Sequence, residues 1–162
     1  LWTPLTAIFL HASPLHITGN MLFLWIFGDN VEDAFGHAYY LPFYLLCGLG
    51  GSFLHMALYP SSSVPCLGAS GAIAGVMGAY FILYPSARIR TFVFGTIIPV
   101  PAIIYIGFWF FMNLISGAFA LSVTATSGTG WFAHIGGFLT GGTIALLLRA
   151  SGRLEQNEAS PQ

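Results

Sequence analysis

The stretch CLGASGAIAGVMGAY, residues 66–80, combines the apolar character of a membrane segment with a serine placed between glycines. Its glycines and alanines are the small residues that let two membrane helices approach closely. The hydroxyl group of Ser70 therefore belongs either to a tightly packed helix interface or to a nucleophile held within one. The residues around it in the other segments distinguish these two roles.

Composition indicates an integral membrane protein. Of the 162 residues, 56% are hydrophobic and 6% are charged, whereas about 25% are charged in a typical soluble domain. The charged residues form three clusters separated by apolar sequence: Asp29–Asp33, Arg88 with Arg90, and Arg149–Glu158. Because the net charge is −1, the chain has no basic surface for nucleic acid, and we expect the lipid bilayer as its surroundings.

Five apolar stretches are candidates for helices that cross a bilayer, which requires about 20 residues each. They cover residues 15–28, 38–59, 69–84, 96–120 and 131–148. Their continuous apolar character, without alternation, argues against a strand barrel. The prediction is an all-α membrane protein, a polytopic helical bundle in which residues 1–150 form one domain and residues 151–162 a polar cytoplasmic tail.

The basic residues predict the orientation of this bundle. Arg88 and Arg90 follow the third stretch, and Arg149 and Arg153 follow the fifth, so the positive-inside rule places the ends of both on the cytoplasmic side. Gly-Asp and Gly-His pairs predict a break and a loop over residues 28–37 on that same side. The loops at 60–68 and 120–130 would then lie outside.

Polar residues from three different stretches converge at one depth. Ser70 precedes Pro85 by 15 residues, and His134 precedes Arg149 by the same 15 residues. His16 lies a similar distance before the acidic cluster. At 1.5 Å of rise per helical residue, all three would lie about 20 Å above the inner boundary of the membrane.

A serine and a histidine at one level suit acyl transfer. The serine hydroxyl becomes a nucleophile when a base removes its proton, and neutral histidine is the usual base. Small residues on the third and fifth stretches would let Ser70 and His134 meet: Gly71, Gly75 and Gly78 on the one, Gly137 and Gly141 on the other. Every Asp and Glu lies near the inner boundary or in the tail, so the expected site is a Ser-His dyad.

Two further residues would supply hydrogen bonds to a developing oxyanion. Asn20 follows His16 by one helical turn on the same face, and both side chains can donate together with the Ser70 backbone N–H. Taken singly, each polar residue has a structural interpretation as packing, interhelical hydrogen bonding or proton relay. Their shared depth favours catalysis. Neither an HExxH motif nor a His/Cys spacing indicates a metal site, and no cofactor is expected.

The aromatic run FWFF at 108–111 is most simply interpreted as lipid-facing bulk. Within it, Trp109 and Phe110 are the candidate residues of a lateral gate for substrate.

The two cysteines, Cys47 within a stretch and Cys66 in a loop, are expected to be free thiols.

Three motifs together resemble the rhomboid family of intramembrane serine proteases: HASPLHITGN at 11–20, GASG around Ser70 and AHIGGFLTG around His134. The resemblance implies a six-helix core of which five transmembrane helices are visible here, the first helix and the loop after it being absent from this chain. That upstream segment would be a partner of the chain. The resemblance also implies Ser70 as nucleophile, His134 as base, and His16 with Asn20 in the oxyanion hole.

The same resemblance implies substrates that are transmembrane segments of other membrane proteins, and it suggests a multi-pass protein of the bacterial inner membrane. One position departs from some members of the family: the tyrosine one turn after the serine is here Ala74. We therefore expect the orientation of His134 to come from packing along its glycine-lined helix face.

Two other function classes stay open at this level. A transporter or channel would also place His and Asn near the middle of the membrane, although paired ionisable groups or matching broken helices are not evident here. A non-catalytic, substrate-binding member of the family would keep the fold. Cleavage of a reporter with Ser70 intact or replaced separates the three.

Overall fold

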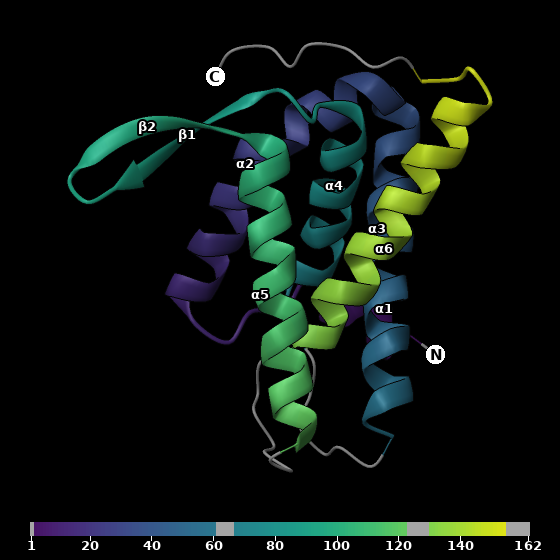
Figure 1. Cartoon of the computed structure of the whole chain (residues 1–162). Helices are drawn as coiled ribbons and strands as arrows, with labels where there is room; N and C mark the ends of the chain where they lie inside the picture. The colour runs from purple at the N-terminus through teal and green to yellow at the C-terminus, as the bar shows by residue number, and fades with distance from the viewer. Residues whose placement is uncertain (1, 61–66, 123–129, 155–162) are drawn as a thin grey trace.

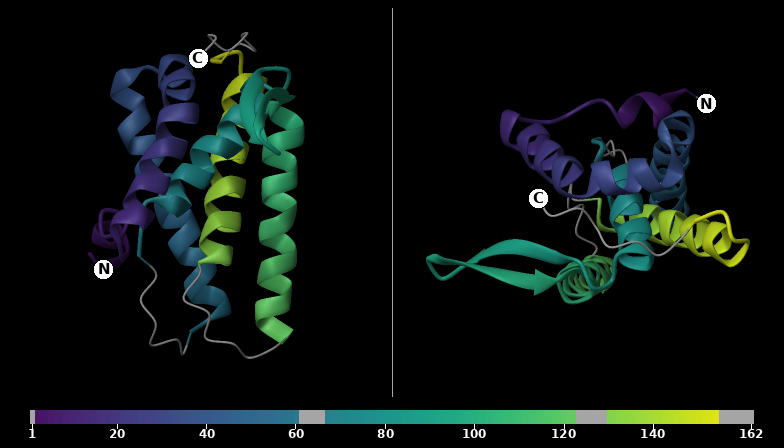
Figure 2. Two further views of the ribbon diagram at one scale, coloured as in Figure 1. Left: turned by 90° about the vertical axis from the view of Figure 1, so that its left-hand side faces the viewer. Right: turned by 90° about the horizontal axis from the view of Figure 1, so that it is seen from above.

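Residues 2–60, 67–122 and 130–154 are described by the computed structural model. Within these residues the chain forms, in order, α1 (Thr3–Ala7), α2 (Pro14–Phe35), α3 (His37–Leu58), α4 (Ser70–Leu83), β1 (Arg88–Val93), β2 (Thr96–Pro101), α5 (Ala102–Ser122) and α6 (Trp131–Ala150). The long helices lie side by side, and the shorter α4 lies among them (Figure 1, Figure 2). The prediction of a predominantly helical bundle is confirmed, except that residues 96–101, predicted as part of a helix, form the strand β2.

The centre of the bundle is α4. Every residue from Gly71 to Tyr80 is buried, and the helix packs on α6, α3, α2 and α5. It contains no charged residue and consists largely of glycine, alanine and aliphatic side chains. Such a helix can be enclosed on all sides because its backbone hydrogen bonds are satisfied within the helix itself.

Glycines bring the backbones of α4 and α6 into direct contact. A methyl group at Gly137 would collide with the carbonyl oxygen of Gly71, and one at Gly141 would collide with that of Gly75. No side chain therefore separates the two helices at these positions. The small-residue tracks predicted on the third and fifth stretches are thus confirmed as a helix interface.

The predicted loop at 28–37 is wrong for most of its length. The helix α2 continues through the acidic cluster to Phe35 and ends at Gly36, whose φ of 81° lies in the left-handed region that favours glycine. Long-range contacts hold this extension, because Tyr84 after α4 donates a hydrogen bond of 2.8 Å to the backbone carbonyl of Asn30. The prediction failed because those contacts come from a distant part of the chain.

Residues 88–101 form an antiparallel hairpin, so the all-α prediction needs correction. Its two-residue turn places Phe94 at φ 46° and Gly95 at φ 87°, as a type I′ hairpin turn requires. Pro99 and Pro101 lack the N–H group that a continuing helix would use. The predicted fourth stretch therefore begins as a strand, and its helix starts at Ala102.

Three of these helices, α3, α5 and α6, are long and apolar enough to cross a membrane. The helix α4 has 14 residues, and α2 carries three acidic residues near its end. Five membrane-crossing helices are therefore not confirmed by length and composition.

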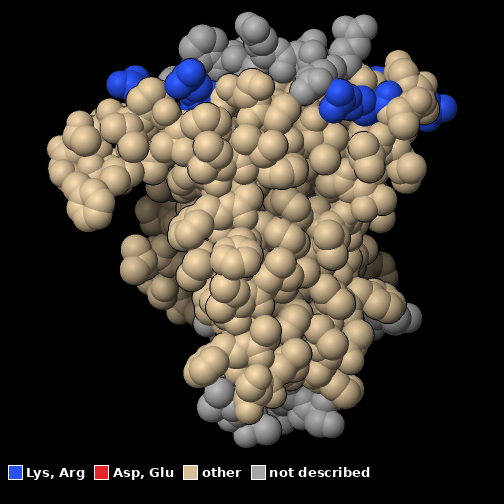
Figure 3. Space-filling view, viewed as in Figure 1, with Lys and Arg blue, Asp and Glu red and all other residues tan. Residues whose placement is uncertain are grey.

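The arginine side chains gather at one end of the molecule, as the positive-inside argument requires (Figure 3). The orientation in a membrane stays a prediction, and residues 61–66, 123–129 and 155–162 of the predicted loops and tail lie outside the described residues.

Substitution of Gly141 tests the contact between α4 and α6. Gly141→Ala should lower the free energy of unfolding by about 1–3 kcal/mol, the usual cost of overpacking, because its methyl group meets a backbone carbonyl that cannot move aside. Gly142→Ala is the matched control, since its Cβ would lie 3.5 Å from the Gly78 carbonyl oxygen, an ordinary contact. Thermal unfolding in detergent checks both; equal midpoints for the two variants would contradict this account of the interface.

Candidate active site

Ser70 is the first residue of α4, and the chain before it is shaped by glycine. Gly68 has a φ of 118°, and its N–H donates to the carbonyl of Ala7 in α1 at 2.9 Å. This turn brings the serine to the end of the central helix, where it is half-buried. The N–H groups of a first helical turn have no acceptor within the helix, so that of Ser70 is available for a ligand at this position.

His134 lies in the first turn of α6, directly beside Ser70. Its Nε2 is 2.9 Å from Ser70 Oγ. The pair is brought together by the glycine contacts between α4 and α6, since Gly71 follows the serine and Gly137 lies one turn beyond the histidine. The two residues, which the sequence predicts at one depth, therefore meet in a direct hydrogen bond.

Asn113 of α5 completes a chain of hydrogen bonds that includes this pair. Its Nδ2 donates to the Trp109 carbonyl oxygen at 2.8 Å, which leaves its Oδ1 to face His134 Nδ1 at 2.8 Å. An amide oxygen only accepts hydrogen bonds, so Nδ1 must carry the hydrogen. Nε2 of His134 then holds a lone pair toward Ser70, and the serine hydroxyl donates to it.

Sequence reasoning missed Asn113 because it considered only carboxylates as a third member of the site. The available signal was a single amide within an otherwise apolar membrane stretch, which is costly unless it is hydrogen-bonded. Asn113 is 3% exposed. Its position opposite His134 depends on how α5 packs against α6, which sequence spacing does not reveal.

The surroundings of the imidazole also differ from the expectation. The Trp109 ring lies 5.8 Å from the His134 ring, with an interplanar angle of 36°, whereas Ala74 is fully buried in the core. The side of His134 is thus covered by an aromatic residue of α5. The orientation of His134 thus comes from packing, as expected, but α5 contributes to it as well as the glycine-lined face: the glycines permit the approach, and Trp109 packs on the ring.

His16 and Asn20 lie on the other side of the serine. Ser13 caps α2 by accepting from the His16 N–H at 3.1 Å, which places the imidazole in the first turn. The Ala12 N–H is 3.4 Å from His16 Nδ1, so Nδ1 accepts and Nε2 carries the hydrogen. A Cβ placed on Gly68 would lie 2.8 Å from His16 Nε2 and 3.5 Å from Asn20 Nδ2. Both nitrogens therefore face the turn before Ser70.

The side chain of Asn20 has an unused donor. Asn20 is 7% exposed, and its buried Nδ2 has no hydrogen-bond partner within the described part of the chain. A buried donor without an acceptor costs free energy, and this one faces the turn before Ser70, where it could donate to a ligand. The donors at this site are the side chains of His16 and Asn20 and the Ser70 backbone.

The acidic residues of α2 take no part in this arrangement, because they lie in its last two turns, where Glu32 pairs with His37. Among the described residues, no group of three or more His, Cys, Asp or Glu side chains could hold a metal ion. Cys47 is a buried free thiol in α3, and Cys66 lies outside the described residues.

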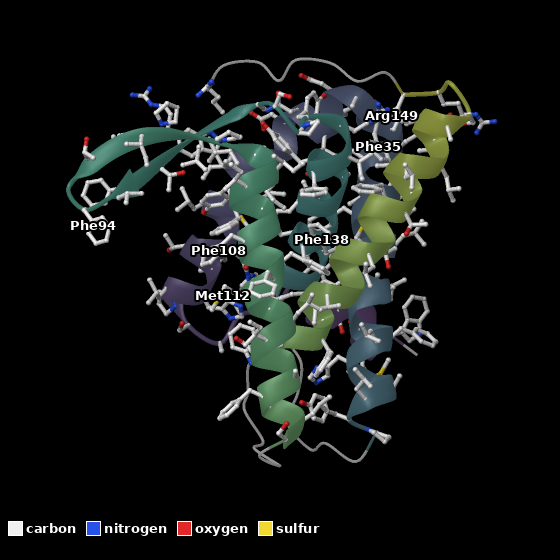
Figure 4. All side chains as sticks on the ribbon, in the orientation of Figure 1. Phe35, Phe94, Phe108, Met112, Phe138 and Arg149 are labelled. Atoms are coloured by element: carbon white, nitrogen blue, oxygen red, sulfur yellow. The ribbon has the colours of Figure 1, made fainter. Side chains whose placement is uncertain are left out.

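The aromatic run of α5 divides between two surfaces. Phe108 and Met112 lie along its outward face (Figure 4), where they are 65% and 43% exposed. Trp109 and Phe110 are half-buried, and Phe110 stacks on Phe138 of α6 at 4.2 Å between ring centroids. The interpretation as lipid-facing bulk therefore fits only part of the run.

Comparisons with known proteins identify the family of this chain. The model of the rhomboid domain family matches residues 1–151. Rhomboid protease GluP of Bacillus subtilis (strain 168) is 38% identical over 143 residues, 86% of this chain and 24% of the relative. RHOMBOID-like protein 6, mitochondrial, of Arabidopsis thaliana is 35% identical over 147 residues, 91% of this chain and 43% of the relative.

Rhomboid protein 1, mitochondrial, of Saccharomyces cerevisiae is 32% identical over 139 residues, 82% of this chain and 38% of the relative. The chain thus spans less than half the length of each of these relatives. The family model nevertheless covers nearly all of it. The chain is an integral membrane protein that belongs to the rhomboid family.

Proposed function

We propose that this chain is the catalytic domain of an intramembrane serine endopeptidase that cleaves transmembrane segments of other membrane proteins. The observation that carries the proposal is the chain of hydrogen bonds Asn113–His134–Ser70, which leaves a lone pair on Nε2 at 2.9 Å from the serine oxygen. A packing serine would not need a histidine held in this tautomer. Membership of a family with protease relatives supports the same conclusion.

In the acylation step, Ser70 Oγ attacks the carbonyl carbon of the scissile peptide bond while its proton passes to His134 Nε2. The carbonyl oxygen becomes an oxyanion, which accepts hydrogen bonds from His16 Nε2, Asn20 Nδ2 and the Ser70 N–H. His134 then gives its proton to the leaving nitrogen, the C–N bond breaks, and an acyl-serine ester remains. Water, deprotonated by the same nitrogen, hydrolyses the ester and restores the serine.

Asn113 acts as a positioning residue in this mechanism. Its carbonyl oxygen holds Nδ1–H and thereby keeps Nε2 directed at the serine throughout the cycle. An amide carries no charge with which to stabilise the imidazolium, whereas the carboxylate of a serine-protease triad contributes a factor on the order of 10⁴. The site is therefore expected to be slower than a triad.

Substrate reaches the site laterally, past α5. This helix packs on α6 and α4, and it meets α2 through side chains such as Tyr105 and Phe27, whose rings lie 6.3 Å apart. Trp109, which packs on the histidine ring, and Phe110, which stacks on Phe138, form the gate in this proposal. A segment with helix-breaking residues would unwind to reach Ser70.

We place the protein in the bacterial inner membrane with the site opening outward, on the strength of the arginine distribution and the Bacillus subtilis relative. The mitochondrial relatives make a mitochondrial membrane the other location for a protein of this family.

A transporter would not need the directed Nε2 lone pair, and a non-catalytic relative would bind substrate without turnover.

Covalent labelling tests the nucleophile and its base. The full-length protein in detergent should react at Ser70 with a fluorophosphonate probe and cleave a membrane-spanning reporter. Ser70→Ala should lose both activities, and His134→Ala should lose both because the hydroxyl then has no base. Ser116→Ala and His55→Ala, which alter the same residue types outside the site, should retain them. Full turnover by a folded Ser70→Ala variant would exclude the serine-protease mechanism.

The oxyanion donors should give a graded effect. His16→Ala or Asn20→Ala leaves the nucleophile and base in place, so turnover should fall by roughly 10²- to 10³-fold, the usual cost of one such donor. The measurement is kcat for the reporter, with thermal unfolding as the check on folding. If turnover fell only in proportion to a lower unfolding midpoint, these residues would have a structural role instead.

Asn113 is tested by substitutions of similar size. Asn113→Leu removes the acceptor and should lower kcat by on the order of 10²-fold, between the loss of one donor and the loss of a triad carboxylate, with KM little changed. Asn113→Asp keeps an oxygen facing Nδ1 and should retain much more activity. A purely structural role would show instead as equal kcat for the two variants at equal unfolding midpoints.

A further inference from the structure

The turn of the β1–β2 hairpin carries a residue that its backbone does not favour. Type I′ turns place two residues at positive φ, where Asn, Asp and Gly are preferred, yet the first of them is Phe94 at φ 46°. A bulky residue in this region is uncommon. The Phe94 side chain is 103% exposed, so no contact within the protein compensates for the strain. Such an outlier points to a role for the side chain outside the protein.

The outer half of the hairpin has an apolar face with Phe92 and Ile97, and its other face mixes Val93 and Ile98 with Thr91 and Thr96. Residues opposite each other in an antiparallel pair share a face, so Phe92 lies beside Ile97 and Thr91 beside Ile98. Phe92 is 73%, Ile97 57% and Ile98 39% exposed. A two-stranded hairpin of this kind is marginal in water, because three or more strands or a packed helix are normally needed for stability.

The inner half of the same hairpin is cationic. Arg88 pairs with Pro101 and Arg90 with Pro99, so both arginines share a face with Phe92. Both are exposed, and neither forms an ion pair with a carboxylate in the part of the chain that the structure describes. The hairpin projects sideways from α5, away from the other helices (Figure 2). Phe94 lies at its outer tip (Figure 4). The arginine side chains lie at the end of the molecule where all the arginines gather, and the tip of the hairpin is farther from that end (Figure 3).

From this arrangement we infer that the β1–β2 hairpin is a membrane-interface anchor that binds anionic lipid. Phe92, Phe94 and Ile97 reach the boundary of the acyl chains, and Arg88 and Arg90 bind lipid phosphate groups. Its two free strand edges keep it at the level of the headgroups, since unpaired backbone groups do not occur against lipid within the hydrocarbon region. This inference concerns lipid binding and holds whether or not the chain is a protease.

The anchor would act directly on α5. The Ala102 N–H donates to the Ala87 carbonyl at 2.7 Å, and the Ile103 N–H donates to the Pro85 carbonyl at 3.1 Å. These bonds join the base of the hairpin to the first turn of α5, the helix that carries Trp109 and Asn113. Lipid held by the hairpin therefore restrains the start of the helix that covers the histidine.

Spin labelling tests the depth of the tip. The full-length protein with Phe94→Cys and Cys66→Ser is labelled and reconstituted in nanodiscs of phosphatidylcholine and phosphatidylglycerol; Cys47 is fully buried. The label should collide more with oxygen than with a nickel chelate, and so should the reference label at Phe108→Cys on the exposed face of α5. A label at Ser151→Cys, exposed at the charged end, is the aqueous control.

A label at position 94 that met the chelate as often as one at position 151 would overturn the inference. This outcome would also be found if the hairpin docked on a protein, since these nanodiscs contain only lipid. Phe94→Asn, which suits the turn better, guards against a folding artefact. Its unfolding midpoint should be unchanged or higher in detergent, while a label at Ile97→Cys in the same variant should move toward the aqueous value.

Lipid selectivity tests the arginines. Native mass spectrometry of protein released from mixed nanodiscs gives the phosphatidylglycerol retained relative to phosphatidylcholine. Arg88→Gln and Arg90→Gln should each lower this ratio by about fivefold, the effect of one basic residue near an anionic surface. Arg153→Gln, at the same end but in the turn after α6, is the matched control and should change it less. An equal loss in all three variants would show that the hairpin has no lipid site of its own.

Discussion

Gly137 and Gly141 of α6 lie against the backbone carbonyl oxygens of Gly71 and Gly75 of α4, so the two helices approach until their backbones touch. The geometry of the site follows from this contact. Ser70 begins α4 one residue before Gly71, and His134 lies one turn before Gly137 of α6. Because no side chain separates the helices, the hydroxyl and the imidazole, one from each helix, come within 2.9 Å. A larger residue at either glycine would separate them.

The second constraint comes from α5, which determines how the imidazole is used. Asn113 binds Nδ1 and Trp109 covers the ring, so the same helix sets both the tautomer and the orientation of His134. Every member of this hydrogen-bond chain is neutral. A carboxylate in the place of Asn113 would carry a charge into an apolar bundle, where an unpaired charge is costly. The amide orients the histidine without that cost.

The hairpin connects this helix to the bilayer. Two strands with an exposed aromatic tip gain little from the rest of the protein, and their stability depends on the medium around them. Their base is hydrogen-bonded to the start of α5, and Trp109 and Asn113 lie further along the same helix, so the lipid interface and the candidate site both involve α5. Membrane composition would thus reach the histidine through one rigid element.

The amino-acid pattern was enough to predict the membrane class and the family, and it pointed to Ser70 and His134 as residues that meet. Long apolar runs placed α3 and α6 to within two residues, and the glycine spacing indicated which helices touch. These features are local, because apolar length and small-residue periodicity are properties of one segment. Tertiary structure alone decided the continuation of α2 past Gly28, the hairpin at 88–101 and the role of Asn113. Tyr84 holds the end of α2 across 54 residues of sequence, and Asn113 meets His134 across 21. A contact between distant residues leaves no periodicity in either segment, so only the packed fold reveals it.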